Sequence, residues 1–291
     1  MGRKQRAQYL IYIVLAVVAV LLYLRLRGGV EGFAGESELV DVPFFIPHKT
    51  SNDSRVVANV PLTIYQSWHD NKVPLKMKET IYKLIEINPE CDYYLYSDDK
   101  SRSFIKENFD EDVLNAFDSL KPGAYKSDLW RYCILYKNGG IYLDIKLYSM
   151  KSLIPIIKEN PTIYVKDWPG SCSEEIGIYN AFMVSPPNNE IFKYCIDDIV
   201  NSCKLKLYKD GVLSITGPCL LGNIIKNKKS LEFIQALPFK LIWFGRPENN
   251  VEIQYNGEAI IKSYSSYRAE QSKFQKTKHY SEMWIARDVY N

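Results

Sequence analysis

The pattern that organises the chain lies in residues 123–146, where apolar residues at helical spacing give way to a short apolar strand. One helical face is formed by residues at i, i+3, i+4 and i+7: Leu129, Tyr132, Cys133 and Tyr136. This spacing predicts an α-helix. Gly139-Gly140 predicts its end, because glycine accepts the left-handed conformation of a C-cap. Residues 141–143 then predict a buried strand that ends at Asp144.

Charged residues flank this predicted helix and strand. Asp128 and Arg131 are three apart, so they are neighbours on the helix surface. Asp144 and Lys146 follow the strand directly, and parallel α/β sheets bind ligands at the carboxyl ends of their strands. The pattern therefore predicts a binding site. The alternative is that Asp128 and Arg131 form an ordinary surface ion pair.

Segments of strand and helix periodicity alternate along the rest of the chain. Strands are expected at 61–65, 92–96, 162–165 and 178–184, and helices at 73–87, 101–109 and 219–225. Three short strands at 241–244, 251–254 and 258–262 are expected to complete the sheet. The prediction is an α/β fold, a mixed sheet with helices on both faces.

The amino-terminal end predicts a membrane anchor. Residues 9–24 carry no charge, with three basic residues before them and two after them. As a helix they span ~24 Å, somewhat short of a ~30 Å hydrocarbon core, which suits a thin secretory-pathway bilayer. We predict that residues 1–27 are a cytoplasmic tail and transmembrane signal-anchor of a single-pass type II protein. A cleaved signal peptide and a buried core helix are the alternatives.

Residues 28–59 show no sustained periodicity and are expected to be a stem before a folded domain at 60–291. The net charge of +3 is small and dispersed, which gives no support for nucleic-acid binding. Six cysteines lack the spacing of a zinc site, and sequence cannot choose among their possible pairings. Cys133, on the apolar helical face, is expected to be a buried free thiol.

The motif Ser127-Asp128-x-x-Arg131, followed by Gly139-Gly140 and the strand that ends at Asp144, resembles glycosyltransferase family 32. This resemblance implies the Rossmann-like GT-A fold and a retaining hexosyltransferase. The donor would be a GDP- or UDP-hexose, with mannose and galactose as first guesses. The acceptor would be a glycan or glycolipid hydroxyl, and the location the Golgi or ER with a lumenal catalytic domain. Asp128 and Arg131 would hold the donor sugar, and Asp144 a divalent metal and the donor diphosphate.

The resemblance also suggests residues that contact the nucleotide and the sugar. Trp68 would stack on the base, although packing at the core edge is an equal alternative. Ser97 or Asp98 would touch the base or ribose, unless they cap the following helix. Asn180 would donate a hydrogen bond to the transferred sugar, or else bond within the sheet edge. 

A late segment of the chain resembles the family's lid. By this likeness His279 and Glu282 are candidate metal ligands, and Trp284 a candidate contact of the diphosphate. The alternative is an aromatic carboxyl-terminal helix that packs on the domain.

Lys146 departs from the family's Asp-x-Asp, because a lysine stands where the second aspartate is expected. Three readings follow. In the preferred one, Asp144 holds Mn²⁺ or Mg²⁺ with help from Glu282 or His279, and Lys146 points away or pairs with a phosphate. In the second, transfer is metal-independent and Lys146 and Arg131 are the cations. In the third, the domain binds its ligand without catalysis.

Two other functions compete with the transferase. One is a non-catalytic sugar-nucleotide-binding partner of an active enzyme. The other is a glycoside hydrolase, which needs two opposed carboxylates such as Asp128 and Asp144. The glycine pair, strand and aspartate argue against the hydrolase.

Overall fold

The computed structural model describes residues 39–50, 54–172, 176–245, 250–274 and 277–291. The chain divides into two units, Met1–Leu39 and Val40–Asn291, and the fold described below is that of the second. The predicted anchor at residues 9–24 lies outside the described residues. Among the residues that are described, no helix is long and apolar enough to cross a membrane.

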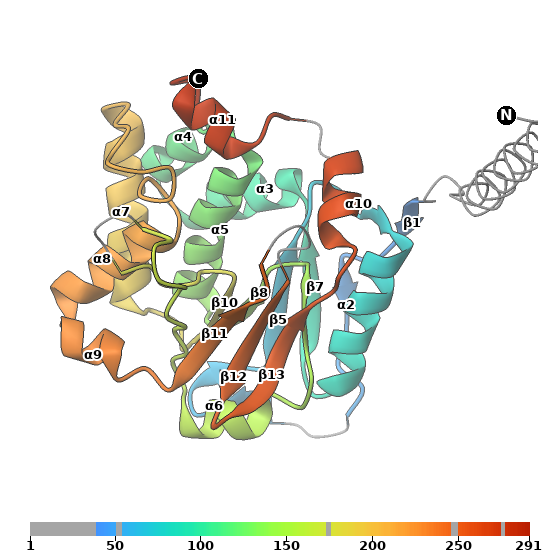
Figure 1. Ribbon diagram of the computed structural model, residues 1–291. Helices are drawn as coiled ribbons and strands as arrows, with labels where there is room; N and C mark the ends of the chain where they lie inside the picture. The colour runs from blue at the N-terminus through green and yellow to red at the C-terminus, as the bar shows by residue number, and fades with distance from the viewer. Residues whose placement is uncertain (1–38, 51–53, 173–175, 246–249, 275–276) are drawn as a thin grey trace, which may run out of the picture. The chain divides into compact units, whose positions relative to one another are not determined.

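The centre of the domain is a five-stranded mixed sheet in the order β10-β8-β5-β7-β2 (Figure 1). Its three inner strands are parallel: β5 (Thr63–Ser67), β7 (Asp92–Tyr96) and β8 (Gly140–Leu143). Its two edge strands are antiparallel to their neighbours: β2 (Phe45–Ile46) and β10 (Phe182–Ser185). The parallel strands place the ends of β5, β7 and β8 at one edge of the sheet. The expected α/β class is confirmed.

Alternation along each strand divides the interior into two cores. In β8, Tyr142 joins the core that contains α3, α4, α5, α7 and α8, whereas Ile141 and Leu143 join the core on the opposite face. The first group of helices is α3 (Asp98–Asn108), α4 (Glu111–Ser119), α5 (Gly123–Asn138), α7 (Glu190–Lys204) and α8 (Pro218–Lys228). On the opposite face pack α2 (Leu75–Ile87) and α6 (Ile154–Glu159). Helices therefore cover both faces, as expected.

Helix α5 is more deeply buried than its sequence pattern indicates. The expected apolar face is present, but every residue from Asp128 to Leu135 is buried. The reason is that α3, α4 and α7 pack around α5, while its carboxyl end leads into β8. Gly139 ends the helix with φ +67°, and a Cβ there would lie 2.6 Å from the backbone nitrogen of Pro187. The predicted glycine stop is confirmed.

The last three strands do not complete the central sheet, which corrects the sequence-based expectation. They are β11 (Phe239–Trp243), β12 (Val251–Tyr255) and β13 (Glu258–Ser263), and they form a second sheet in the order β11-β12-β13-β9. The fourth member, β9 (Leu147–Ser149), pairs with β13 directly after the turn at Asp144. That turn therefore joins the central sheet to the second sheet.

The remaining elements frame these layers. Short strands are β1 (Leu39–Asp41), β3 (Val56–Val57), β4 (Val60–Pro61) and β6 (Lys72–Pro74), and short helices are α9 (Leu231–Gln235), α10 (Tyr267–Phe274) and α11 (Tyr280–Ile285). Part of residues 28–59, the segment expected to be a stem, is folded into the domain: β2 belongs to the central sheet and Val42 is fully buried. The strand expected at 162–165 is reduced to isolated bridges, such as Ile163 with Val184.

One disulfide joins Cys172 to Cys219 at the start of α8. The other four cysteines are free and buried: Cys91, Cys133, Cys195 and Cys203. The expectation that Cys133 is a buried free thiol is confirmed.

Candidate functional site

A cavity of about 600 Å³ lies at the carboxyl edge of the parallel strands. Ser67 at the end of β5 and Asp144 after β8 line it, together with the first half of α5. This is the edge at which open α/β sheets bind their ligands. All of the residues 128, 131, 144 and 146 line this one cavity.

Arg131 joins the two aspartates of the cavity. Its Nη1 lies 3.3 Å from Oδ1 of Asp128, and its Nη2 lies 3.4 Å from Oδ1 of Asp144. Nη1 also donates to the backbone oxygen of Asn180 at 3.0 Å. Asp128 and Arg131 are only 8% and 6% exposed, so they are not an ordinary surface ion pair. We refer to Asp128, Arg131 and Asp144 as the Asp–Arg–Asp network.

Two further side chains fix Asp128. Asn180 donates from Nδ2 to Oδ1 of Asp128 at 2.9 Å, and Thr216 donates from Oγ1 to Oδ2 at 2.7 Å. Burial raises the pKa of Asp128, and the Arg131 guanidinium and these two donors oppose that rise. Asn180 lines the cavity, but its amide is used within the protein as well. The orientation of Asp128 is thus set before any ligand binds.

The turn after β8 brings a second cation to Asp144. Lys146 Nζ lies 3.1 Å from Oδ2 of Asp144, while the hydroxyl of Tyr142 donates to Oδ1 at 2.9 Å. Gln66 fixes the turn because its Nε2 donates to the backbone oxygens of Asp144 at 3.1 Å and of Leu147 at 3.3 Å. Burial alone would raise the pKa of Asp144, but the charges of Lys146 and Arg131 outweigh burial and lower it.

Trp68 and Asp98 line the cavity, whereas Ser97 does not. The Oγ of Ser97 accepts from the backbone N–H of Lys100 at 3.2 Å, so Ser97 caps α3. The capping alternative therefore holds for Ser97.

Two buried polar groups of the cavity have no hydrogen-bond partner among the described residues. They are the indole Nε1 of Trp68 and the hydroxyl of Tyr179. Buried polar groups without a partner are costly, and a polar ligand would satisfy both.

Of the three carboxyl-terminal residues expected to contact the metal or the diphosphate, only His279 lines the cavity. His279 lines the cavity, but its Nδ1 accepts from the backbone N–H of Ser281 and caps α11. Burial and the neighbouring Arg268 lower the pKa of His279. Glu282 is exposed and Trp284 packs against the core beside α5, and neither lines the cavity, because α11 turns these side chains elsewhere. 

The family resemblance implies a divalent metal, and the side chains around Asp144 do not fit one. Mn²⁺ and Mg²⁺ require oxygen ligands, whereas protonated lysine offers only N–H donors. Here Lys146 and Arg131 contact the two oxygens of Asp144. Within the described part of the chain, no three His, Cys, Asp or Glu side chains are close enough together to hold a metal ion.

Several residues of the cavity were missed by the sequence analysis. They are Tyr142, Asp167, Tyr179, Tyr267 and Arg268. The bond that Thr216 donates to Asp128 was not predicted either, although Thr216 does not line the cavity. Thr216 lies in a Thr-Gly-Pro turn, whose sequence signals only the turn, not the bond to Asp128. Asp167 comes two residues after the strand expected at 162–165, which forms only isolated bridges in the structure, and no motif marked it as a site residue. Its carboxylate accepts from the backbone N–H of Trp168 at 2.9 Å, and burial raises its pKa to about 6.

Replacing Asp167 with asparagine is expected to stabilise the protein above pH 6. Because its folded-state pKa is raised, the folded protein binds more protons than the unfolded chain between pH 4 and 6, and stability falls as pH rises through this window. The shift corresponds to at most about 3 kcal/mol, which the asparagine variant would recover. Urea unfolding of both proteins from pH 4 to 8 measures the effect. Asp112→Asn, on the exposed surface of α4, is the control. Equal pH dependence in the wild type and the Asp167 variant would contradict the expectation.

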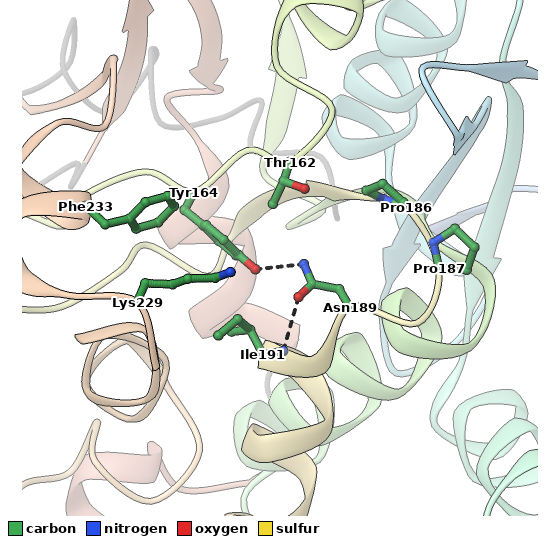
Figure 2. Close-up of a pocket in the computed structure, with 8 residues that line it drawn as sticks. All are labelled: Thr162, Tyr164, Pro186, Pro187, Asn189, Ile191, Lys229 and Phe233. Carbon is green, nitrogen blue, oxygen red and sulfur yellow. Dashed lines mark hydrogen bonds between the residues drawn. The ribbon is translucent and has the colours of Figure 1, made fainter. Parts of the chain in front are cut away.

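A second cavity of about 340 Å³ lies beside Pro186 and Pro187, which follow β10 (Figure 2). Pro187 approaches Gly139 at the start of β8, so this cavity is at the opposite, amino end of that strand. Two of its polar side chains already bond to each other, since Asn189 donates to the hydroxyl of Tyr164 at 2.9 Å. It is therefore the weaker candidate for a polar ligand.

Known proteins are similar in sequence to the part of the chain that includes residues lining the first cavity. Residues 74–163 match the family model described as "Glycosyltransferase sugar-binding region containing DXD motif". Inositol phosphoceramide mannosyltransferase 3 of Schizosaccharomyces pombe is 33% identical over 39% of this chain and 35% of its own length. Inositol phosphoceramide mannosyltransferase 1 of the same yeast is 28% identical over 62% of this chain and 61% of its own. 

Among solved structures, PaToxG glycosyltransferase aligns with a TM-score of 0.45 at 14% identity, over 58% of this chain and 70% of that one. The chain spans between 35% and 61% of the length of the two yeast relatives. The whole Asp–Arg–Asp network falls inside the segment that matches the family model. These matches support a glycosyltransferase family 32-like protein.

Proposed function

We propose that this chain is a hexosyltransferase of the GT-A type, which moves a hexose from a nucleoside diphosphate sugar to an acceptor hydroxyl. The observation that carries the proposal is the Asp–Arg–Asp network, which lines one cavity at the carboxyl edge of the parallel strands. Asp128 is a buried carboxylate that Asn180 and Thr216 already hold in one orientation. It is suited to bind sugar hydroxyls, because it does not have to be reoriented when the sugar binds.

The cavity also has groups suited to the nucleotide. The flat ring of Trp68 can cover a base, and its buried Nε1 lacks a partner among the described residues. Asp98 lies in the first turn of α3 on the same cavity and is proposed to face the ribose. Asn180 and Asp128 are proposed to face the hexose, which places the diphosphate toward Asp144.

The reaction proposed is a front-face substitution with retention of configuration. The bond between the anomeric carbon and the diphosphate oxygen breaks, and its electron pair goes to that oxygen. The acceptor oxygen bonds to the same carbon from the same face, and its proton passes to the departing diphosphate. Asp128 and Asp144 are both held by Arg131, so we assign neither of them as a covalent nucleophile. Catalysis then consists of positioning and charge stabilisation.

Mannose is the proposed hexose and a glycolipid hydroxyl the proposed acceptor, in line with the names of the two yeast relatives. An aromatic surface beside the cavity supports a sugar-bearing acceptor. Trp168 lines the cavity and stacks on Trp243, with ring centroids 5.7 Å apart, and Trp243 is 42% exposed. Sugar rings pack readily against exposed indole faces of this kind.

The proposed location is the lumen of the Golgi or ER, with residues 9–24 as the anchor. The Cys172–Cys219 disulfide supports an oxidising compartment, because such bonds persist in secretory compartments and are rare in the cytosol.

A donor panel tests the proposed function. The purified chain is incubated separately with GDP-mannose, UDP-galactose and UDP-glucose, with and without a phosphoinositol-ceramide acceptor, and the release of nucleoside diphosphate is measured. We expect release from GDP-mannose that rises when the acceptor is added. Tight binding of a donor without any release would instead support the rival function, a sugar-nucleotide-binding partner. Neither binding nor release from any donor would refute both.

A further inference from the structure

The turn between the two sheets holds a lysine where it can act on a diphosphate. The backbone oxygen of Lys146 accepts from the N–H of Tyr264 at 3.1 Å, and the next residue begins β9, so the main chain is fixed on both sides. The side chain is 17% exposed and reaches the cavity. Its ammonium group lies 5.6 Å from the ring centre of Tyr179 and 6.0 Å from that of Tyr267. These rings limit where the ammonium group can go.

The charges of the four ion-paired side chains at this turn balance without a metal ion. Asp128 and Asp144 carry two negative charges, and Arg131 and Lys146 carry two positive charges. With aspartate at position 146, the same four side chains would carry a net charge of −2, which one divalent cation would neutralise. The lysine therefore replaces, within the chain, the charge that a bound Mn²⁺ or Mg²⁺ would bring.

We propose that Lys146, together with Arg131, is the cation that binds the donor diphosphate, and that the chain binds nucleoside diphosphates without a divalent metal. This inference rests on the proposed function. When the bond between the anomeric carbon and the diphosphate breaks, the new negative charge on the phosphate oxygen forms next to these two cations. Positive charge held in place before the reaction stabilises such a charge without reorganisation. Asp144 then acts as a positioning residue, because it contacts both cations.

Calorimetric titration of the full chain with GDP and UDP tests the inference, first in EDTA and then in Mn²⁺. We expect the wild type to bind one of them in EDTA, with an affinity that Mn²⁺ changes by less than about threefold. Lys146→Ala is expected to lose about 10- to 100-fold in affinity in EDTA, the usual effect of removing one charge-assisted contact. Lys146→Asp is expected to lose affinity in EDTA and to recover it in Mn²⁺.

The control is Lys193→Ala, which removes a lysine that is also ion-paired with an aspartate but lies on the surface of α7. Its affinity should equal that of the wild type. Binding of Mn²⁺ alone, followed by electron paramagnetic resonance, should be seen for Lys146→Asp and not for the wild type. Wild-type binding of GDP or UDP only in the presence of Mn²⁺ would overturn the inference and leave the proposed function standing. Failure to bind either nucleotide under both conditions would remove the proposed function and this inference together.

Discussion

Replacing Arg131 with alanine is expected to destabilise the protein by about 3–5 kcal/mol and to abolish donor binding. Arg131 is the cation between two carboxylates, 3.3 Å from Asp128 and 3.4 Å from Asp144. Its removal leaves Asp128, which is buried, without an opposite charge, and buried unpaired charges are strongly unfavourable. The backbone oxygen of Asn180 loses its donor as well. Urea unfolding and donor titration measure the two effects.

The matched control for this variant is Arg102→Ala. Arg102 also pairs with an aspartate, Asp118, at 2.6 Å, but this pair is exposed on α3 and α4. Exposed ion pairs contribute little to stability, so the control should unfold at nearly the same urea concentration as the wild type and bind donor normally. Similar losses of stability in the two variants would mean that Arg131 does not compensate a buried charge on Asp128, and would contradict the geometry of the network.

Replacing Asp144 with asparagine is expected to reduce the rate of hexose transfer by about 10²–10³-fold, while the fold is retained. Asparagine keeps the shape of the side chain and can still bond to Tyr142, so the structural change is small. What is lost is the negative charge that holds Arg131 and Lys146 in one place. The two cations then separate, and the developing charge on the diphosphate is less well stabilised. Turnover of the donor under single-turnover conditions gives the effect.

Asp118→Asn serves as the control for Asp144→Asn, because it removes an ion-paired aspartate that does not line the cavity. The two thermal unfolding curves should be close to that of the wild type, which separates a loss of rate from a loss of folded protein. Transfer by Asp144→Asn at the wild-type rate would show that the charge at this position has no part in the reaction.

The central part of the site could be predicted from sequence because its signals are local. Helical spacing placed Asp128 and Arg131 on one turn of α5, and a glycine stop followed by three apolar residues placed Asp144 at the end of β8. The parallel direction of β5, β7 and β8 then brings the strand ends together. Each step needs only the period of a helix or strand and the conformational freedom of Gly139.

The rest of the site depends on contacts between distant segments, which periodicity does not encode. Thr216 reaches Asp128 from a turn 88 positions away, and Asp167 enters the cavity from an irregular segment. The last three strands have the same period whether they join the central sheet or pair with β9, so their assignment was wrong. The roles expected of Glu282 and Trp284 depended on which side of α11 faces the cavity, and the sequence of this short helix does not determine that.

A crystal structure of the chain with a bound nucleoside diphosphate hexose tests the central claim most directly. We expect the diphosphate within hydrogen-bonding distance of Lys146 or Arg131, and the hexose against Asp128, in the cavity at the carboxyl edge of β5 and β8. Density for the nucleotide sugar in the other cavity, beside Pro187 and Asn189, with the Asp–Arg–Asp network uncontacted, would contradict it.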